Sequence, residues 1–565
     1  MHKKILYCFL LFCFSQFEIA GQTFYLKISE IAEANKKKTE SLYYIQKHKD
    51  YRSIENEWQR LKQTIYKQGY INAKWQPLTK MNDSVFTSEV VFGLKVDSIK
   101  ISFQPNQIPE HLLKTAALDT LQNTFVIPFS DVEKTMQQLN AGISSLGKPF
   151  NKLQLTNIQS ETAHVLTAQL VVSGEKQPRY INNIVIKGYE LFPKSYLKHY
   201  LNIKPGQVLN LESIKVKTDN LQELPFANKI RDSEILFSQD STILYMYLEK
   251  VKSNAFDGFL GFGTNQETSK LELNGYLNLE LVNNLNFGES LSLAYRSDEN
   301  EQTSFQVTIK TPYLFNSPVG AEVALRIFKK DSSFTTTNQR ANLIYQLNSK
   351  HSISGGILST TSSNLLATTN LNPLIKDYTS IFYTANYQFR AHTKSGPIVK
   401  TPTALQLQIG TGNRNIKSQK VSQLLYDLEA FKTINLNLRN HLFLKAISFG
   451  LFSEDYLENE LARFGGIKSI RGFEENSLTA SLYGVLQTEY RYSLTPELYV
   501  HSITDLAYLE NQINSQKEKL VSLGLGFALK TKAGLLQFNY ATGKTENQNF
   551  KLANSKIHLS LSALF

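Results

Sequence analysis

The sequence predicts α+β modules of the order strand, helix, helix, strand, strand, followed by an all-β antiparallel transmembrane barrel of about 16 strands. Two observations lead to this fold class. A helical pattern recurs three times before residue 252, and apolar and polar residues alternate strictly from residue 254 onward. The expected domains are a signal peptide over 1–21, modules over 22–95, 96–177 and 178–252, and a barrel over 253–565.

The N-terminus predicts export. Lys3 and Lys4 precede an apolar run over 5–14, and small residues follow at Ala20 and Gly21. This order is typical of a secretory signal peptide, and the run is too short to span a bilayer. Both cysteines of the chain lie inside it, so we expect a mature protein without a disulfide or a thiolate metal site.

The repeat is seen in the helical periods. They begin at Ile54, Val132 and Leu211, which are 78 and 79 residues apart, and Ser130 with Glu133 predicts a capping box at the second helix. Strand-like segments precede the second and third helices, and two more follow each helix. Each repeat is therefore expected to be a small sheet with helices on one face.

The second half of the chain predicts membrane-spanning strands. No later segment approaches the roughly 18 consecutive apolar residues of a transmembrane helix, so a membrane domain here has to be a barrel. About 16 strands leave roughly 20 residues for each strand and its loop, which suits an outer-membrane barrel. The last strand carries Ile557, Leu559, Leu561 and Phe565 on one face, and the first is expected to contain Phe256, Gly258, Gly261 and Gly263.

Other kinds of chemistry have little support in the sequence. The net charge of +12 comes from dispersed lysines in an exported chain, so nucleic acid is not an expected partner. The ten histidines form no H-E-x-x-H motif, and no metal or cofactor is expected. Gly543, Lys544 and Thr545 mimic the end of a phosphate-binding loop, but Phe538 stands where its first glycine is needed, and a hairpin turn is the interpretation.

One motif interrupts the alternating strands. It reads R-F-G-G-I-K-S-I-R-G-F over 463–473, with backbone freedom at its glycines and an arginine between apolar neighbours. Taken alone it could be a surface turn with an exposed arginine. Its candidate residues are Gly465, Gly466, Ile470, Arg471, Gly472 and Phe473.

The modules and the motif together resemble a known family. L-K-Q-T-I-Y-K-Q-G-Y at 61–70 and I-N-N-I-V-I-K-G-Y at 181–189 resemble polypeptide-transport-associated (POTRA) domains. F-G-G-I-K-S-I-R-G-F-E-E-N-S at 464–477 resembles the lumen loop of the outer-membrane family that holds BamA, TamA and the two-partner secretion transporters. The resemblance implies that this loop folds into the barrel and that Arg471 pairs with acidic residues of the next strands, for which Glu489 and Asp505 are the candidates. A guanidinium shared by two carboxylates would hold the loop in place.

The resemblance also implies a function. With three modules the layout is most similar to TamA, and the expected activity is insertion or export of client polypeptides through a seam between the first and last strands, without nucleotide hydrolysis. The expected location is the outer membrane of a diderm bacterium, with the modules in the periplasm. Expected partners are unfolded clients, membrane lipids and a periplasmic or inner-membrane protein. A dedicated two-partner exporter is the alternative, and a passive channel or an outer-membrane hydrolase is less favoured because no catalytic constellation is evident.

Overall fold

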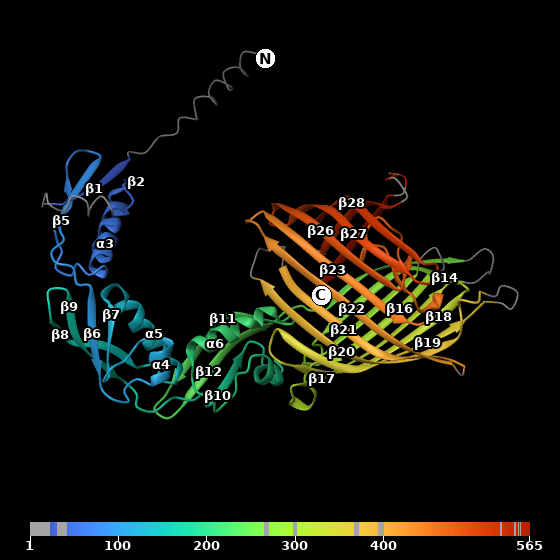
Figure 1. Ribbon diagram of the computed structural model, residues 1–565, viewed down its shortest axis with the longest axis horizontal. Coiled ribbons are helices and arrows are strands. Elements are labelled where there is room, and N and C mark those ends of the chain that lie inside the picture. Colours follow the sequence, from blue (N-terminus) through green and yellow to red (C-terminus); the bar gives the residue numbers. More distant parts are fainter. Residues whose placement is uncertain are drawn as a thin grey trace, which may run out of the picture. The chain divides into compact units, whose positions relative to one another are not determined.

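Two units make up the chain in this computed structural model: residues 1–180 with 208–212, and residues 181–207 with 213–565. The first unit holds two α+β modules, and the second holds a third module and a barrel (Figure 1). The residues described are 23–30, 42–264, 271–297, 302–366, 372–393, 401–417, 419–531, 534–546, 550–551, 553 and 555–564. The expected signal peptide lies outside them.

The first module packs one long helix against a small sheet. The sheet runs in the order β2-β1-β5-β3, with β4 also paired to β5 and with β1 parallel to β5. The Asp50 side chain caps helix α3 by accepting the Ser53 N–H at 2.7 Å. Ile54, Leu61 and Ile65 lie on the buried face of the helix. The elements are β1 (Phe24–Glu30), β2 (Lys47–His48), α3 (Tyr51–Lys67), β3 (Lys74–Trp75), β4 (Thr79–Lys80) and β5 (Val85–Val91).

The second module repeats this plan with a four-stranded sheet and a second helix. Its sheet has the order β7-β6-β9-β8, with β6 parallel to β9. The predicted capping box is wrong, because Ser130 lies within a 3₁₀ turn that leads into α5, and the residue before the helix, Asp131, makes no side-chain cap. The elements are β6 (Ser98–Phe103), α4 (Glu110–Thr115), β7 (Thr124–Pro128), η2 (Phe129–Asp131), α5 (Val132–Ser145), β8 (Lys152–Ser160) and β9 (Val165–Ser173).

The third module has the same parallel pairing of its first and last strands. The sheet order is β10-β12-β11, and a π-helical turn, η3, stands where the first helix is expected. The predicted α+β modules are therefore confirmed, although their helices differ in length and type. The elements are β10 (Asn183–Lys187), η3 (Tyr196–Tyr200), α6 (Leu211–Asp219), η4 (Asn220–Glu223), β11 (Ala227–Phe237) and β12 (Thr242–Lys250).

The third module contacts two turns of the barrel. The Tyr196 hydroxyl donates to the Gly288 carbonyl at 3.3 Å, and its ring meets the edge of Tyr313 with the centroids 4.9 Å apart. His199 lies 2.8 Å from the Asn316 carbonyl through Nε2. Gly288 has a φ of 77°, and any side chain there would overlap the Tyr196 ring. Burial raises the pKa of the Tyr196 phenol far above its usual range.

The barrel is a closed antiparallel sheet in which, over the described residues, sixteen strands follow one another in chain order except for the hairpin β24–β25. This confirms the predicted fold class. The strands are β13 (Ala255–Thr264), β14 (Leu271–Val282), β15 (Ser290–Ser297), β16 (Gln302–Thr311), β17 (Val319–Lys330), β18 (Phe334–Gln346), β19 (His351–Asn364), β20 (Tyr378–Thr393), β21 (Thr401–Ile416), β22 (Gln419–Asn435), β23 (Asn440–Ser453), β26 (Leu482–Thr495), β27 (Leu498–Asn511), β28 (Gln516–Lys530), β29 (Leu535–Thr545) and β30 (Lys556–Leu564). A short 3₁₀ turn, η5 (Leu314–Asn316), joins β16 to β17.

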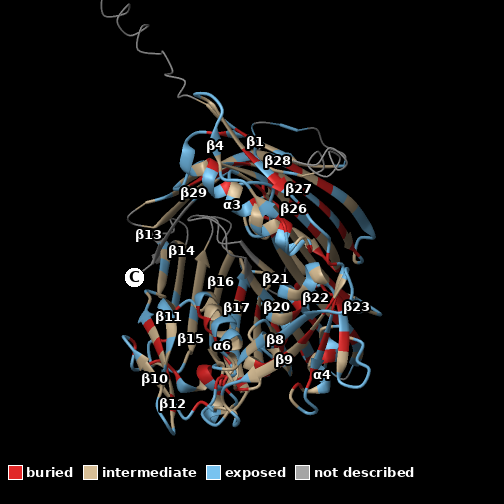
Figure 2. Cartoon of the chain, turned by 90° about the vertical axis from the view of Figure 1, so that its left-hand side faces the viewer, coloured by how far each residue is buried: buried red, intermediate tan, exposed pale blue. Residues whose placement is uncertain are grey.

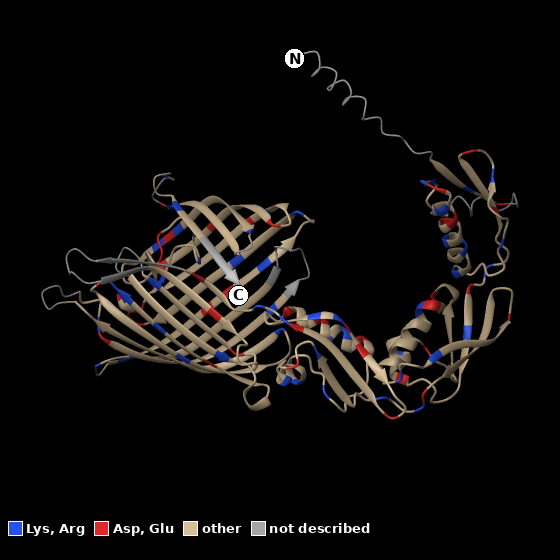
Figure 3. Ribbon diagram, turned by 180° about the vertical axis from the view of Figure 1, so that it is seen from behind, with Lys and Arg blue, Asp and Glu red and all other residues tan. Residues whose placement is uncertain are grey.

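The barrel wall is apolar outside and polar inside. Apolar side chains alternate along the strands and are exposed, among them Leu343, Tyr383, Ile409, Leu525 and Leu559. Polar side chains at the intervening positions are buried, among them Thr360, Gln408, Gln487, Glu489 and Asp505. Figure 2 shows the mixed burial along these strands, and Figure 3 shows how sparsely charged residues occur over the barrel ribbon. An apolar exterior around a polar interior is the pattern of a transmembrane barrel.

None of the helices in the described part of the chain is long and apolar enough to cross a bilayer.

Candidate functional site

A long loop between β23 and β26 enters the barrel. It contains a 3₁₀ turn, η6 (Glu458–Glu460), and a short hairpin of β24 (Ala462–Phe464) and β25 (Leu478–Ala480). The hairpin tip spans 465–477 and contains the arginine motif. Ile470 is fully buried at this tip, in an apolar cluster with Val485, Leu509 and Leu520 of strands β26, β27 and β28. The tip is therefore packed against the inner face of the wall.

Arg471 makes the densest set of polar contacts at the tip. Its Nε and Nη2 donate to the two carboxylate oxygens of Asp505 at 2.9 and 2.6 Å, and its backbone N–H donates to Asp505 Oδ2 at 3.0 Å. Its Nη1 also pairs with Glu489. Glu489 in turn accepts from Arg491 Nε at 2.8 Å. The structure thus brings together the three residues that the sequence suggested, and adds Arg491.

This cluster is balanced in charge and shielded from solvent. Two guanidinium groups face two carboxylates, and Arg471, Glu489 and Asp505 are all buried, with Asp505 fully inaccessible. In such a place a carboxylate that loses its partner is left as an uncompensated buried charge. The arrangement offers no nucleophile with an adjacent base. What it can do chemically is fix the position of the loop.

Glycines let the tip approach the wall closely. Gly465, Gly466 and Gly472 have φ values of 117°, 88° and 78°, which L-residues rarely adopt. A Cβ on Gly472 would lie 2.6 Å from the backbone nitrogen of Gly543 in β29 and 2.9 Å from Ser522 Oγ. The Gly465 N–H also donates to Ser469 Oγ at 2.7 Å. Gly472 leaves no space for a side chain against the wall, whereas side chains at Gly465 and Gly466 would overlap Glu474 and Glu475 of the loop itself.

Phe473, the aromatic residue of the motif, packs against Gly543 of β29. A Cβ on Gly543 would overlap the ring of Phe473. The interpretation of 543–545 as a hairpin turn is wrong, because these residues continue strand β29 and pair with β28. The absence of a side chain at Gly543 leaves room for Phe473 against the wall. The sequence carried a signal for this contact, since a glycine inside a strand marks a close approach.

Two acidic residues follow Phe473 and contact other strands. Glu474 Oε1 lies 2.9 Å from Lys556 Nζ at the start of β30. Glu475 pairs with Arg296 of β15, and a Cβ on Gly466 would overlap the Glu475 carboxylate. The tip therefore contacts β26 to β30 on one side and β15 on the other.

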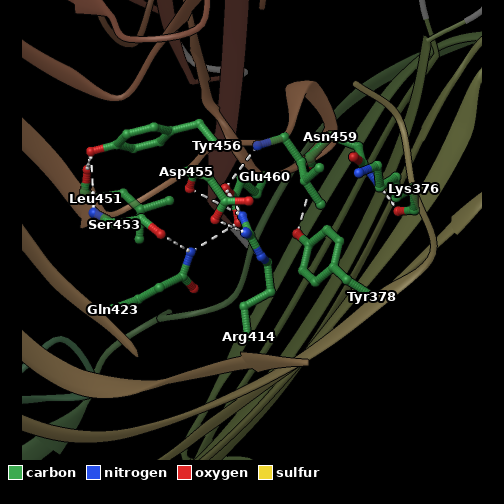
Figure 4. Close-up of polar contacts among 11 residues, drawn as sticks. Lys376, Tyr378, Arg414, Gln423, Leu451, Ser453, Asp455, Tyr456, Asn459 and Glu460 are labelled. Carbon is green, nitrogen blue, oxygen red and sulfur yellow. Dashed lines mark hydrogen bonds and ion pairs between the residues drawn. The ribbon is translucent and has the colours of Figure 1, made fainter. Parts of the chain in front are cut away.

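The base of the loop has a second arginine anchor, which the sequence analysis missed (Figure 4). Arg414 of β21 is fully buried and donates from Nη1 to Glu460 Oε1 at 2.5 Å and to the Asp455 carbonyl at 3.3 Å. Its Nη2 pairs with the Asp455 carboxylate. Gln423 of β22 donates to Glu460 Oε2 at 3.0 Å. The available signal was the acid-rich run over 454–460 directly before the glycine motif.

Further contacts hold the same segment to neighbouring strands. Asn459 Nδ2 donates to Ser362 Oγ at 2.9 Å and to the Lys376 carbonyl at 2.8 Å. Glu458 lies 3.4 Å from Lys330 Nζ. The loop is thus fixed at its base to β17, β19, β21 and β22, and at its tip to the strands described above.

The seam between the first and last strands has few backbone pairs. β13 pairs along its described length with β14, from Ala255 to Thr264. Among the described residues it pairs with β30 at two positions, Ala255 with Leu564 and Phe256 with Ala563. The predicted seam residues Gly258, Gly261 and Gly263 lie in β13 beyond this pairing, and Ile557, Leu559 and Leu561 lie in β30. Phe565 lies outside the described residues.

Fold and loop together define a transmembrane barrel with an arginine-anchored lumen loop and tandem α+β modules. Residues 283–565, half of the chain, match the Omp85 superfamily domain, and residues 179–247 match the POTRA family, described as a surface antigen variable number repeat. The chain therefore belongs to the Omp85 superfamily, as predicted. Family membership places it among polypeptide insertases and exporters without choosing between them.

Solved structures agree with this fold. CdiB from Acinetobacter baumannii is 16% identical with a TM-score of 0.54, covering 91% of this chain and 97% of that one. CdiB from Escherichia coli is 14% identical with a TM-score of 0.53, covering 90% and 96%. BamA from Haemophilus ducreyi lacking POTRA domains 1–3 also matches at 14% identity, with a TM-score of 0.48 and coverage of 83% and 100%. The sequence matches no curated protein.

Proposed function

We propose that this protein inserts client polypeptides into the outer membrane of a diderm bacterium, or translocates them across it, through the seam between β13 and β30. The observation that supports the proposal most strongly is the incomplete pairing of these strands, which share two backbone pairs in the described residues whereas β13 and β14 are paired from Ala255 to Thr264. The modules would lie in the periplasm.

The seam offers a physical route for assembly. Unpaired N–H and C=O groups at a strand edge can pair with an incoming strand, and in the hydrocarbon region every such group has to be satisfied. Gly258, Gly261 and Gly263 have no side chains of their own to pack against a neighbouring strand. A client strand that pairs with β13 gains these hydrogen bonds and buries its apolar face in lipid. Nucleotide hydrolysis is not needed to drive this step.

The lumen loop has a supporting role in this proposal. Arg471 with Asp505 and Glu489 holds the tip, and Arg414 with Glu460 holds the base. A loop held at both ends keeps the wall in shape while the seam opens. The modules would guide unfolded clients or bind a periplasmic or inner-membrane partner through the edges of their sheets.

A disulfide across the seam tests the proposal. Phe256 and Ala563 are register partners, so the pair Phe256→Cys and Ala563→Cys closes the seam covalently. In liposomes, the oxidised protein is expected to stop assembling a purified client barrel, and reduction is expected to restore assembly. The matched control joins register partners within the wall, Val307→Cys and Leu325→Cys, and is expected to stay active in both states. Full activity of the oxidised seam variant would refute the route.

A dedicated exporter of one secreted protein is the second candidate. It is favoured by a polar cavity of about 530 Å³ inside the barrel, lined by residues that include Arg326, Arg340 and Asp427. Depletion of the protein followed by quantitative proteomics of the outer membrane and the medium separates the two. An insertase predicts loss of many unrelated barrels, and a dedicated exporter predicts loss of one or a few secreted proteins with other barrels intact.

A further inference from the structure

We propose that Glu475 and Arg296 are positioning residues that hold the loop tip across the seam and thereby keep the seam closed until a client arrives. This inference rests on the proposed function, since it assumes that the seam is where clients enter. It concerns an ion pair that lies outside the Arg471 cluster and links the tip to the opposite side of the seam.

Consecutive residues of the tip reach both sides of the seam. Glu474 pairs with Lys556 of β30, the last strand, at 2.9 Å. Glu475 pairs with Arg296 of β15, which stands opposite Tyr276 of β14. Tyr276 in turn stands opposite Phe259 of β13, the first strand. The neighbouring residues Glu474 and Glu475 therefore contact the last strand, β30, and the third strand, β15.

These contacts lie away from the backbone pairs that join β13 to β30 in the described part of the chain. In the described residues, β13 pairs with β30 at Ala255 and Phe256. Arg296 lies in register, through β14, with Phe259, three residues further along β13. Lys556 begins β30, at the other end of that strand from Leu564, the partner of Ala255. The two ion pairs thus supply, from inside the barrel, a connection away from the two backbone pairs that β13 and β30 share in the described residues.

The two ion pairs differ in how far their side chains are exposed to solvent. The Glu475 and Arg296 side chains are 23% and 36% exposed, whereas those of Glu474 and Lys556 are 56% and 37% exposed. Solvent and salt screen the more exposed pair more strongly. Glu475 is also held against Gly466, where a side chain would overlap its carboxylate. The Glu475–Arg296 pair is therefore the stronger of the two connections.

Opening of the seam has to break this pair. Arg471 fixes the tip to β26 and β27, and Gly472 lies against β29, so the tip stays with the last-strand side. Arg296 belongs to the first-strand side. When β30 separates from β13, the distance between Glu475 and Arg296 increases, and their attraction resists the movement.

The test measures the seam directly in the full chain reconstituted in lipid nanodiscs. Spin labels at Leu277→Cys in β14 and Leu559→Cys in β30 report the distance across the seam by pulsed electron paramagnetic resonance. We expect Arg296→Gln and Glu475→Gln each to add a population of longer distances, and the double variant to add no more than either alone. Arg296→Lys keeps the charge and is expected to restore much of the native distribution.

A matched control and a second measurement complete the design. Glu429 and Lys445 form an ion pair at 2.8 Å between β22 and β23, with side chains 44% and 20% exposed, so Glu429→Gln and Lys445→Gln are expected to leave the seam distance unchanged. In the protein with Glu475 and Arg296 intact, raising the salt concentration is expected to shift the distribution in the same direction as Arg296→Gln. This measurement does not depend on whether the substituted variants fold.

Two results would overturn the inference. If Arg296→Gln and high salt both leave the distances native, no ion pair restrains the seam. If Glu475→Gln alone widens the distribution, Glu475 acts within its own loop and not across the seam. Because the readout is a distance and not client assembly, these results are distinguishable from failure of the seam disulfide test, which concerns the proposed function itself.

Discussion

Arg471 and Asp505 are joined by three hydrogen bonds, two from the guanidinium and one from the backbone N–H of the arginine. One carboxylate of the wall therefore fixes both the side chain and the main chain of the loop tip. The other carboxylate, Glu489, is shared with Arg491 and is less specific to the loop.

Asp505→Asn is expected to lower the free energy of unfolding by about 3 to 5 kcal/mol, because it leaves a buried guanidinium without its main partner. Denaturant titration of the refolded protein in detergent measures this change. Lys517→Gln removes a largely exposed partner of Glu510 and is expected to change stability by less than about 0.5 kcal/mol. Equal effects of the two substitutions would contradict the anchoring role of Asp505.

Gly472→Ala is expected to displace the loop tip. The φ of 78° costs an alanine about 1 to 2 kcal/mol, and its methyl group would overlap the Gly543 backbone. Limited trypsin digestion reports the displacement, since a released tip exposes the buried Arg471 to cleavage. The control is Gly484→Ala in β26, where the added methyl group would find its nearest neighbour, Ser448 Oγ, at 3.9 Å. Cleavage that is equally slow in both variants would show that the close approach is unnecessary.

Arg414→Gln is expected to loosen the base of the loop while the tip remains in place. Glu460 would keep its contact with Gln423 but lose its charged partner in a buried setting. Hydrogen exchange measured by mass spectrometry should become faster over 455–460 and stay unchanged over 469–473. Arg439→Gln changes an exposed arginine of the β22–β23 turn and serves as the control. Unaltered exchange at 455–460 would mean that Arg414 does not anchor the loop.

Glu57 makes the first module sensitive to acid. Hydrogen bonds from Arg60, and a further one from the Ile45 N–H, lower the pKa of this buried carboxyl below its usual value of 4.5. A depressed folded pKa contributes stability that is complete above the unfolded value and is lost as the pH falls through the folded value. Hydrogen exchange of α3 in the full chain should therefore accelerate below about pH 4.5. Glu57→Gln should remove most of this pH dependence, and an unchanged profile in that variant would assign it to another group.

Much of the fold could be predicted because its signals are periodic. Apolar residues at helical spacing gave α3 and α5, and strict alternation gave the barrel strands with their apolar exterior. The capping box at Ser130 failed because the end of β7 at Pro128 leads into a 3₁₀ turn, which places the serine inside the turn. Such local geometry depends on how the preceding strand ends, and the motif alone does not contain it.

The residues of the candidate site also differ in whether the sequence could predict their contacts. Arg471 could be selected with Glu489 and Asp505 because the loop motif resembles a known one and the acidic residues follow in the next strands. Arg414 carries no such motif, and its partners Asp455 and Glu460 lie more than one strand away in sequence. Gly543 was assigned to a turn because its contact with Phe473 joins segments that only the closed barrel brings together.

The contact between Tyr196 and Gly288 has a mechanical consequence. The Tyr196 ring occupies the space next to Gly288 and also packs on Tyr313. The third module therefore contacts the turns that follow β14 and β16. A pull or twist applied to this module is delivered to those strands. They are close neighbours of β13 in the wall. A force on the third module would therefore act on strands close to the β13–β30 seam, where these two strands share two backbone pairs in the described residues.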